Sequence, residues 1–212
     1  MEGCSNLRLG GGGVQAAVAA VLACPNASCY LHAPVGRDFD SSLLNGLRER
    51  NVRTDAVCAI DVPTTPGERI RYENEKMVWD NVGWDCWPQL CAWVPPLDGK
   101  YDLVHVLVEG GGDGEVRAAL NAMEREPAPF LSVEPIMHRV DEEAVSGLSR
   151  LSALADVVSP DFHTTVQIAR MSDSSLPDVL DDIRTHPDRL KSVACGCTKA
   201  LRLKDSAVLA IR

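Results

Sequence analysis

Short aliphatic runs alternate with amphipathic helical stretches along the chain, and this alternation limits the fold more than any other feature. The run over 103–108 is Leu-Val-His-Val-Leu-Val, and a helical pattern over 114–125 follows it. A second aliphatic run over 130–133 precedes another helical pattern over 141–154. Such an alternation is typical of βαβ units that build a mostly parallel sheet. We therefore predict an α/β fold in which residues 103–108 form a strand buried on both faces.

The remaining segments extend this pattern to both ends of the chain. Before residue 103 we expect helices and strands in the order helix 15–22, strand 28–33, helix 41–50, an apolar run over 57–62, and a strand or hairpin over 69–79. After residue 154 we expect a strand over 156–158 and helical segments over 163–170 and 177–185. The chain then closes with an apolar strand over 192–194 and a last segment over 200–211. No internal repeat or low-complexity linker interrupts the chain, so we expect residues 1–212 to form a single domain.

Charge and hydropathy exclude several function classes. The formal net charge is -9, the sequence pI is about 5.0, and no run of Lys or Arg exceeds two residues, so we expect no nucleic-acid partner. No stretch of about 18 apolar residues and no signal-like apolar segment occurs, so we expect no membrane partner and a cytoplasmic location.

The eight cysteines show no metal-binding spacing, because no Cys-x-x-Cys occurs and no histidine completes a zinc set. We interpret them as reduced, mostly buried thiols. Cys195 and Cys197 flank one glycine at the end of the predicted strand over 192–194. Packing is the favoured interpretation of this pair and redox activity is the alternative.

A glycine run, Gly10 to Gly13, stands immediately before an alanine-rich helical segment. Glycines lack Cβ atoms, so backbone N–H groups at this positive helix end can closely approach a ligand. The alternative is a flexible start to an ordinary helix. Asp38 follows the next strand end, Val35-Gly36, and is either a ligand contact or a turn cap.

The spacing of these residues resembles the first signature of the ribokinase, or PfkB-type, carbohydrate kinases. In that signature Gly-Gly-x-Gly-x-Asn-x-Ala opens a helix and Val-Gly-x-Asp ends a strand. Gln15 stands where most members have Asn. Further segments resemble family motifs in family order, and the matching stretches are 47–55, 64–69, 101–106, 132–135 and 154–161.

The resemblance implies a three-layer, Rossmann-like, ribokinase-type α/β fold with a mostly parallel central sheet, incomplete at both ends. It implies ATP and Mg²⁺ as cofactors and transfer of the γ-phosphate to a hydroxyl of a sugar or nucleoside. The substrate-binding residues that it implies are Gly11, Gly12, Gly13, Gln15, Asp38 and Glu109, and the nucleotide-binding residue is Asp161. We expect the glycine loop and Glu109 to line one concavity.

Three departures from the family pattern lead us to expect impaired catalysis. Only nine residues precede Gly10, although a sugar-binding Asp and part of a β-lid stand there in the family. The family's Pro-Asn-x-x-Glu motif appears with Asp161 for Asn and Thr164 for the magnesium-organising Glu. The Gly-Ala-Gly-Asp loop that carries the anion hole and the catalytic base does not occur within the 212 residues.

Other interpretations stay open beside the kinase-like one. All four tryptophans, at 79, 84, 87 and 93, lie in one proline-containing segment, either as core anchors or as a partner surface. A non-catalytic scaffold, a truncated gene and a homodimer are each compatible with these features. A dinucleotide-dependent oxidoreductase ranks last, because no strand precedes Gly10. His105, inside an aliphatic strand, is interpreted as a hydrogen-bonded core residue.

Overall fold

The computed structural model describes residues 9–73, 76–97, 99–108, 113–136, 142–172 and 187–211. The chain divides into two compact units, Met1–Pro96 (unit 1) and Leu97–Arg212 (unit 2), and each is described by itself. The single-domain expectation therefore stays a prediction. Within the described residues, no helix has the length and apolar character needed to cross a bilayer.

Unit 1 opens with helix α1 (Gly12–Ala23), strand β1 (Cys29–Val35), the 3₁₀ turn η1 (Ser41–Leu44), helix α2 (Asn45–Arg48) and strand β2 (Val52–Ala59). β1 and β2 pair in parallel, with Cys29 opposite Val52 at one end and Val35 opposite Ala59 at the other. The small core between these elements consists of Ala17, Val21, Leu31, Leu44, Leu47 and Val52.

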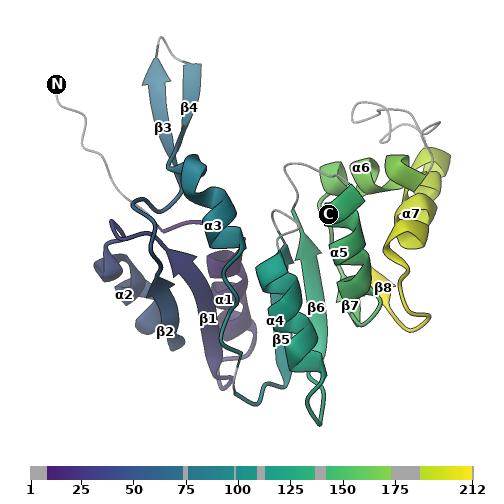
Figure 1. Cartoon of the computed structure of the whole chain (residues 1–212), viewed down its shortest axis with the longest axis horizontal. Coiled ribbons are helices and arrows are strands. Elements are labelled where there is room, and N and C mark those ends of the chain that lie inside the picture. The colour runs from purple at the N-terminus through teal and green to yellow at the C-terminus, as the bar shows by residue number, and fades with distance from the viewer. Residues whose placement is uncertain are drawn as a thin grey trace. The chain divides into compact units, whose positions relative to one another are not determined.

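A hairpin completes unit 1 (Figure 1) and confirms the expectation of a strand or hairpin over 69–79. Strands β3 (Gly67–Glu73) and β4 (Lys76–Val82) pair antiparallel, and η2 (Trp84–Cys86) and helix α3 (Trp87–Cys91) follow. Cys86 and Leu90 are buried against Val62, so α3 is fixed to the segment that leaves β2.

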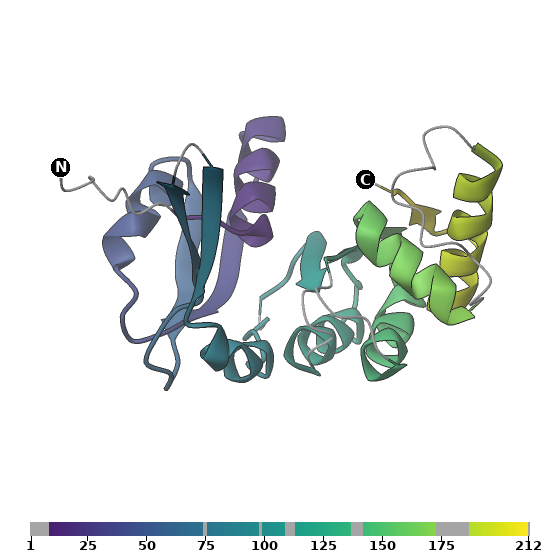
Figure 2. The ribbon, with the colours of Figure 1, turned by 90° about the horizontal axis from the view of Figure 1, so that it is seen from above.

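Unit 2 is a parallel four-stranded sheet with helices packed on it. Its elements are β5 (Leu103–Val108), α4 (Asp113–Met123), β6 (Phe130–Pro135), α5 (Glu142–Ser152), β7 (Val157–Val158), α6 (Phe162–Ser172), α7 (Pro187–Leu201) and β8 (Val208–Leu209). The strand order is β5-β6-β7-β8. Figure 2 shows α4 and α5 side by side along β5 and β6.

β5 has the predicted bounds, but the prediction that both of its faces are buried is wrong. Val104, Val106 and Val108 are buried against the helices, whereas Leu103 is 55% exposed. Its register partner Phe130 on β6 is 45% exposed. The described residues of unit 2 therefore cover one face of these strands more completely than the other.

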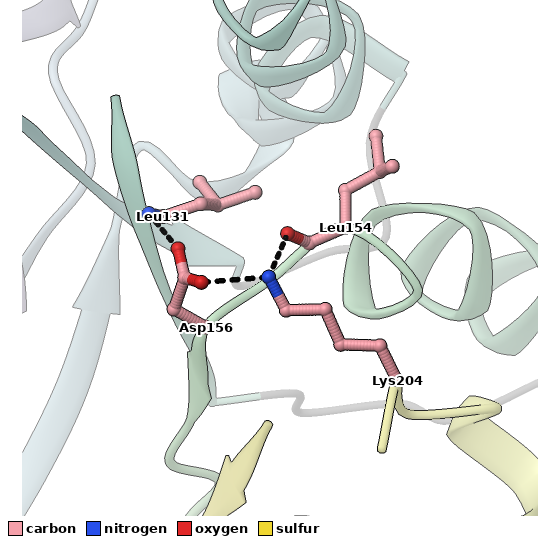
Figure 3. Close-up of polar contacts among 4 residues, drawn as sticks. All are labelled: Leu131, Leu154, Asp156 and Lys204. Atoms are coloured by element: carbon pink, nitrogen blue, oxygen red, sulfur yellow. Dashed lines mark hydrogen bonds and ion pairs between the residues drawn. The ribbon is translucent and has the colours of Figure 1, made fainter. Parts of the chain in front are cut away.

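A polar clamp fixes the short strands β7 and β8 to β6 (Figure 3). Lys204, which precedes β8, donates to Asp156 Oδ1 at 2.6 Å and to the Leu154 carbonyl at 3.3 Å. Asp156 Oδ2 accepts from the Leu131 N–H at 2.9 Å. The hydrogen bond from Lys204, followed by that from Leu131, lowers the pKa of Asp156. Two-residue strands have few ladder bonds, so these side-chain bonds add to the backbone bonds that hold β7 between β6 and β8.

The carboxyl-terminal region departs from the sequence prediction. Residues 192–194 lie inside helix α7 and form no strand, and of residues 200–211 only Val208–Leu209 is a strand. The cysteines are also less buried than expected, because only Cys86 and Cys197 are buried among the seven that the structure describes. The helical prediction over 177–185 lies outside the described residues.

Candidate functional site

The amino-terminal end of α1 lies at the carboxyl-terminal end of β1. α1 packs along β1, and a tight turn over residues 24–28 reverses the chain between them. A Cβ at Gly13 would lie 3.6 Å from Leu31 Cδ1, which places the start of the helix over this strand. Ligands of open α/β sheets bind at the carboxyl ends of strands. The predicted glycine loop therefore opens at the end of β1 where ligands of such sheets bind.

Gly11 sets the entry to α1. Its φ of 96° and ψ of 151° form a backbone conformation that L side chains rarely adopt, and no side chain caps the helix. The first N–H groups of an α-helix lack partners within the helix. Gly12 and Gly13 carry two of these groups, and Gln15, one turn into the helix, is exposed. Among the described residues, the start of α1 therefore presents hydrogen-bond donors that no side chain caps.

The turn that follows β1 is held tightly to the segment that enters the hairpin. The Gly36 N–H donates to Thr65 Oγ1 at 2.8 Å, and the Thr65 N–H donates to Asp38 Oδ1 at 2.7 Å. A Cβ at Gly36 would lie 2.4 Å from the carbonyl carbon of Thr64 and 2.5 Å from the nitrogen of Thr65. Only glycine permits this approach of two backbones.

Asp38 therefore has a bracing role that the sequence did not reveal. Its Oδ1 is engaged by Thr65, and the side chain is exposed. Within the described part of the chain, Asp38 Oδ2 makes no hydrogen bond, so it can accept one from a ligand hydroxyl. The two interpretations of Asp38, ligand contact and cap, are compatible because each needs a different oxygen.

Asp161 and Thr164 form no magnesium site within the described structure, and the nucleotide-binding role of Asp161 stays a prediction. Asp161 Oδ1 accepts from the Thr164 N–H at 2.7 Å and so caps α6. The Thr164 side chain is fully buried, so this position faces the core of unit 2. Among the described residues, no group of three or more His, Cys, Asp or Glu gathers to hold a metal ion. We derive no step through ATP or Mg²⁺ from these residues.

Glu109 lies outside the described residues, and its neighbouring strand belongs to unit 2. The predicted concavity shared by Glu109 and the glycine loop therefore stays a prediction. In unit 1, the structure brings together two parts of the predicted site at one sheet edge, the start of α1 and the Gly36–Asp38 turn. The structure adds Thr65 to these residues. Thr65 lies in the segment 64–69, which resembles a family motif, and no role for it is predicted from the sequence.

His105 lies in a row of polar side chains on β5 and β6. The sequence predicted that His105 is hydrogen-bonded but did not identify its partners. Its Nδ1 lies 3.0 Å from Ser132 Oγ, and its Nε2 lies 3.1 Å from Glu134 Oε2. The order Ser, His, carboxylate is that of a hydrolytic triad. However, Ser132 lies in the middle of β6, whose backbone pairs with β5 on one side and β7 on the other. The backbone N–H groups of β6 that the structure describes face its neighbouring strands, so we interpret the row as a structural network.

The tryptophan segment has the geometry of an anchor. The rings of Trp84 and Trp87 stack with centroids 5.2 Å apart and planes at 27°. Both residues and Trp93 are half-buried, beside the buried Cys86 and Leu90. Stacked, partly buried rings stabilise the α3 region and leave limited area for a partner.

Comparisons with protein-family models and with curated proteins give no match. Solved structures do match. A ribokinase from Cryptococcus neoformans var. grubii serotype A, solved with ADP, is similar with a TM-score of 0.65 and 16% identity over 96% of this chain. A ribokinase from Giardia lamblia has a TM-score of 0.59 and 15% identity over 97% of this chain. A putative ribokinase from Thermoplasma acidophilum has a TM-score of 0.55 and 20% identity over 84% of this chain.

These matches confirm the ribokinase-type α/β fold with a mostly parallel sheet. At such identities the likeness is one of fold. The chain spans 61% of the Cryptococcus protein and 63% of the Giardia protein.

Proposed function

We propose that this protein is a carbohydrate-kinase-like protein that binds a sugar or nucleoside at the carboxyl-terminal edge of β1. The observation that supports this most is the brace at Gly36, where Asp38 and Thr65 fix the turn beside the glycine-rich start of α1. Solved structures of similar fold are ribokinases, which supports a sugar as the ligand class. A shared fold does not by itself assign a ligand, so the binding proposal depends on the brace at Gly36 as well.

The chemistry of this edge suits a polyhydroxylated ligand. Sugar hydroxyls both donate and accept hydrogen bonds. Asp38 Oδ2 is an acceptor for one hydroxyl, and a hydrogen bond to an ionised carboxylate is stronger than one between neutral groups. The N–H groups at the start of α1 donate to another hydroxyl, and Gln15 can do both. Because the edge is exposed, we expect weak to moderate affinity.

We further propose that the 212 residues bind this ligand without transferring a phosphoryl group to it. Phosphoryl transfer needs charge neutralisation by a metal ion and a base for the attacking hydroxyl. The position where the family has its magnesium-organising acid is the buried Thr164. A missing base alone lowers rates by ~10²–10⁴-fold. A coupled ADP-release assay tests this, and sugar-dependent turnover of ~1–100 s⁻¹ would contradict it.

The binding proposal is tested by calorimetry with a panel of pentoses, hexoses and nucleosides. Gly11→Ala and Gly10→Ala are a matched pair, because a Cβ at either position meets nothing within 4 Å and only Gly11 has a positive φ. We expect Gly11→Ala to weaken binding and Gly10→Ala to leave it unchanged. Asp38→Asn keeps an oxygen for Thr65 and removes the charge, so we expect weaker binding with an intact fold. Equal binding by Gly11→Ala and Asp38→Asn would contradict the proposed edge.

A second candidate function is association through the hairpin. Ile70 and Met77 are each 50% exposed, and the register places both on one face of the hairpin. Exposed apolar side chains that share a face are typical of interaction surfaces. Ile70→Arg is expected to dissociate an assembly formed through this face, as measured by analytical ultracentrifugation. Arg69→Glu, an exposed position on the opposite face of the same strand, is the control.

A further inference from the structure

Strand β5 lies at one edge of the unit 2 sheet. The strand order β5-β6-β7-β8 leaves its second edge without a partner strand among the described residues. The Val108 carbonyl accepts from the Ile136 N–H, so Val108 turns its backbone groups toward β6. Along a strand, the backbone groups of successive residues point to alternate edges. The open edge of β5 is therefore lined by the N–H and C=O groups of Leu103, His105 and Leu107.

This edge has none of the features that protect sheet edges from other strands, which are charges, prolines, bulges and short length. β5 is six residues long, contains no Asp, Glu, Lys, Arg or Pro, and pairs with β6 without a register shift. The other open edges within the described residues each have such protection. It consists of Pro34 and a register shift in β1, Arg53 and Asp55 in β2, the Arg71–Asp80 ion pair in the hairpin, and a length of two residues in β8.

The sequence of β5 is suited to a second copy of itself. Residues 103–107 read Leu-Val-His-Val-Leu in both directions. If two copies pair antiparallel with His105 opposite His105, Leu103 lies opposite Leu107 and Val104 lies opposite Val106. Hydrogen-bonded pairs alternate with other pairs along an antiparallel ladder. In this register the residues that face the open edge, 103, 105 and 107, pair only with one another. The backbone pattern and the side-chain pattern therefore agree on one two-fold register.

We propose that two copies of this chain associate through their β5 edges, antiparallel and with the two-fold axis at His105, so that the two unit 2 sheets become one. The pairs of Val104 with Val106 extend the buried face that packs on the helices, and such cross-strand pairs stabilise a sheet. The His105 ring does not obstruct the axis, because its nitrogens lie within hydrogen-bond distance of Ser132 and Glu134 on β6. The proposal does not depend on the sugar-binding proposal.

Analytical ultracentrifugation of the 212-residue chain at micromolar concentrations tests the association, and we expect a reversible equilibrium between monomer and dimer. Leu103→Lys places a charge at the edge of both copies and is expected to weaken the dimer about tenfold or more. Phe130→Lys is the matched control, because Phe130 is the register partner of Leu103, is similarly exposed and lies one strand farther from the edge. We expect Phe130→Lys to associate as the wild type does. Circular dichroism verifies that both variants fold.

The other outcomes of this experiment each contradict the proposal. A chain that stays monomeric would overturn it. Equal losses in Leu103→Lys and Phe130→Lys would assign the association to the open face of the sheet. Loss of the dimer in Ile70→Arg, with Leu103→Lys unchanged, would assign it to the hairpin. The proposed edge requires that Leu103→Lys weakens the dimer and that the other two variants do not.

Hydrogen exchange measured by NMR tests the register without a substitution. The amides of Leu103, His105 and Leu107 should become protected as the protein concentration rises. Those of Val104 and Val106 face β6 and should be protected at every concentration. In a mixture of labelled and unlabelled chains, we expect an intermolecular contact between the Hα atoms of Val104 and Val106, which form a pair without hydrogen bonds in this register. A dimer that lacks the concentration-dependent protection or this contact would overturn the proposal.

Discussion

Gly36 is the position where a single methyl group should be most costly to unit 1. In Gly36→Ala the added Cβ would lie 2.4, 2.5 and 2.8 Å from three backbone atoms of Thr64 and Thr65. Ordinary contacts are more than 3.4 Å, so the two segments must separate by about 1 Å. Such overpacking costs about 1–3 kcal/mol. The separation also breaks the 2.8 Å bond from the Gly36 N–H, at about 1 kcal/mol. We expect a total loss of about 2–4 kcal/mol.

Urea unfolding followed by tryptophan fluorescence measures this loss. All four tryptophans lie between residues 79 and 93, so the signal reports unit 1. Gly67→Ala is the matched control, because a Cβ there meets nothing within 4 Å and we expect no destabilisation. Thr65→Val removes the acceptor of the Gly36 N–H, and Thr65→Ser keeps it, so only the first should lose about 1 kcal/mol. A Gly36→Ala protein within 0.5 kcal/mol of the wild type would refute the packing argument.

Two further predictions concern unit 2. At pH 7, Asp156→Asn should cost about 1 kcal/mol, because the ion pair with Lys204 is only partly buried and solvent screens it. The pKa of Asp156 is lowered in the folded state, so its contribution is present above the ordinary value of 3.8 and is lost as the pH falls through the lowered value. The difference in urea midpoint between Asp156→Asn and wild type should therefore be constant above this ordinary value and shrink as the pH falls below it. Burial raises the pKa of Cys197 to about 12, so native protein at pH 8 should be alkylated at Cys195 and not at Cys197 by mass spectrometry. Alkylation of Cys197 at the rate of Cys195 would contradict its burial.

The sequence predicted strands best where the run is almost wholly aliphatic. Leu103–Val108, with His105 as its one polar residue, matches its prediction residue for residue, because a short, nearly aliphatic run between turn signals leaves few alternatives. The error over 192–194 arises because a short apolar stretch does not distinguish a strand from a buried helix. A helical signal was present, since Val193, Cys197 and Leu201 recur every four residues and are all buried.

The site was predictable only in its local parts. Glycines before a helix and an aspartate after a strand are adjacent in the sequence and carry their own physical meaning. The partner of Asp38 is Thr65, 27 residues away, and the nearer ring partner of His105 is Ser132, also 27 residues away. Such pairs depend on strand register and on the path of the chain between elements. Neither is encoded in the spacing of any short motif.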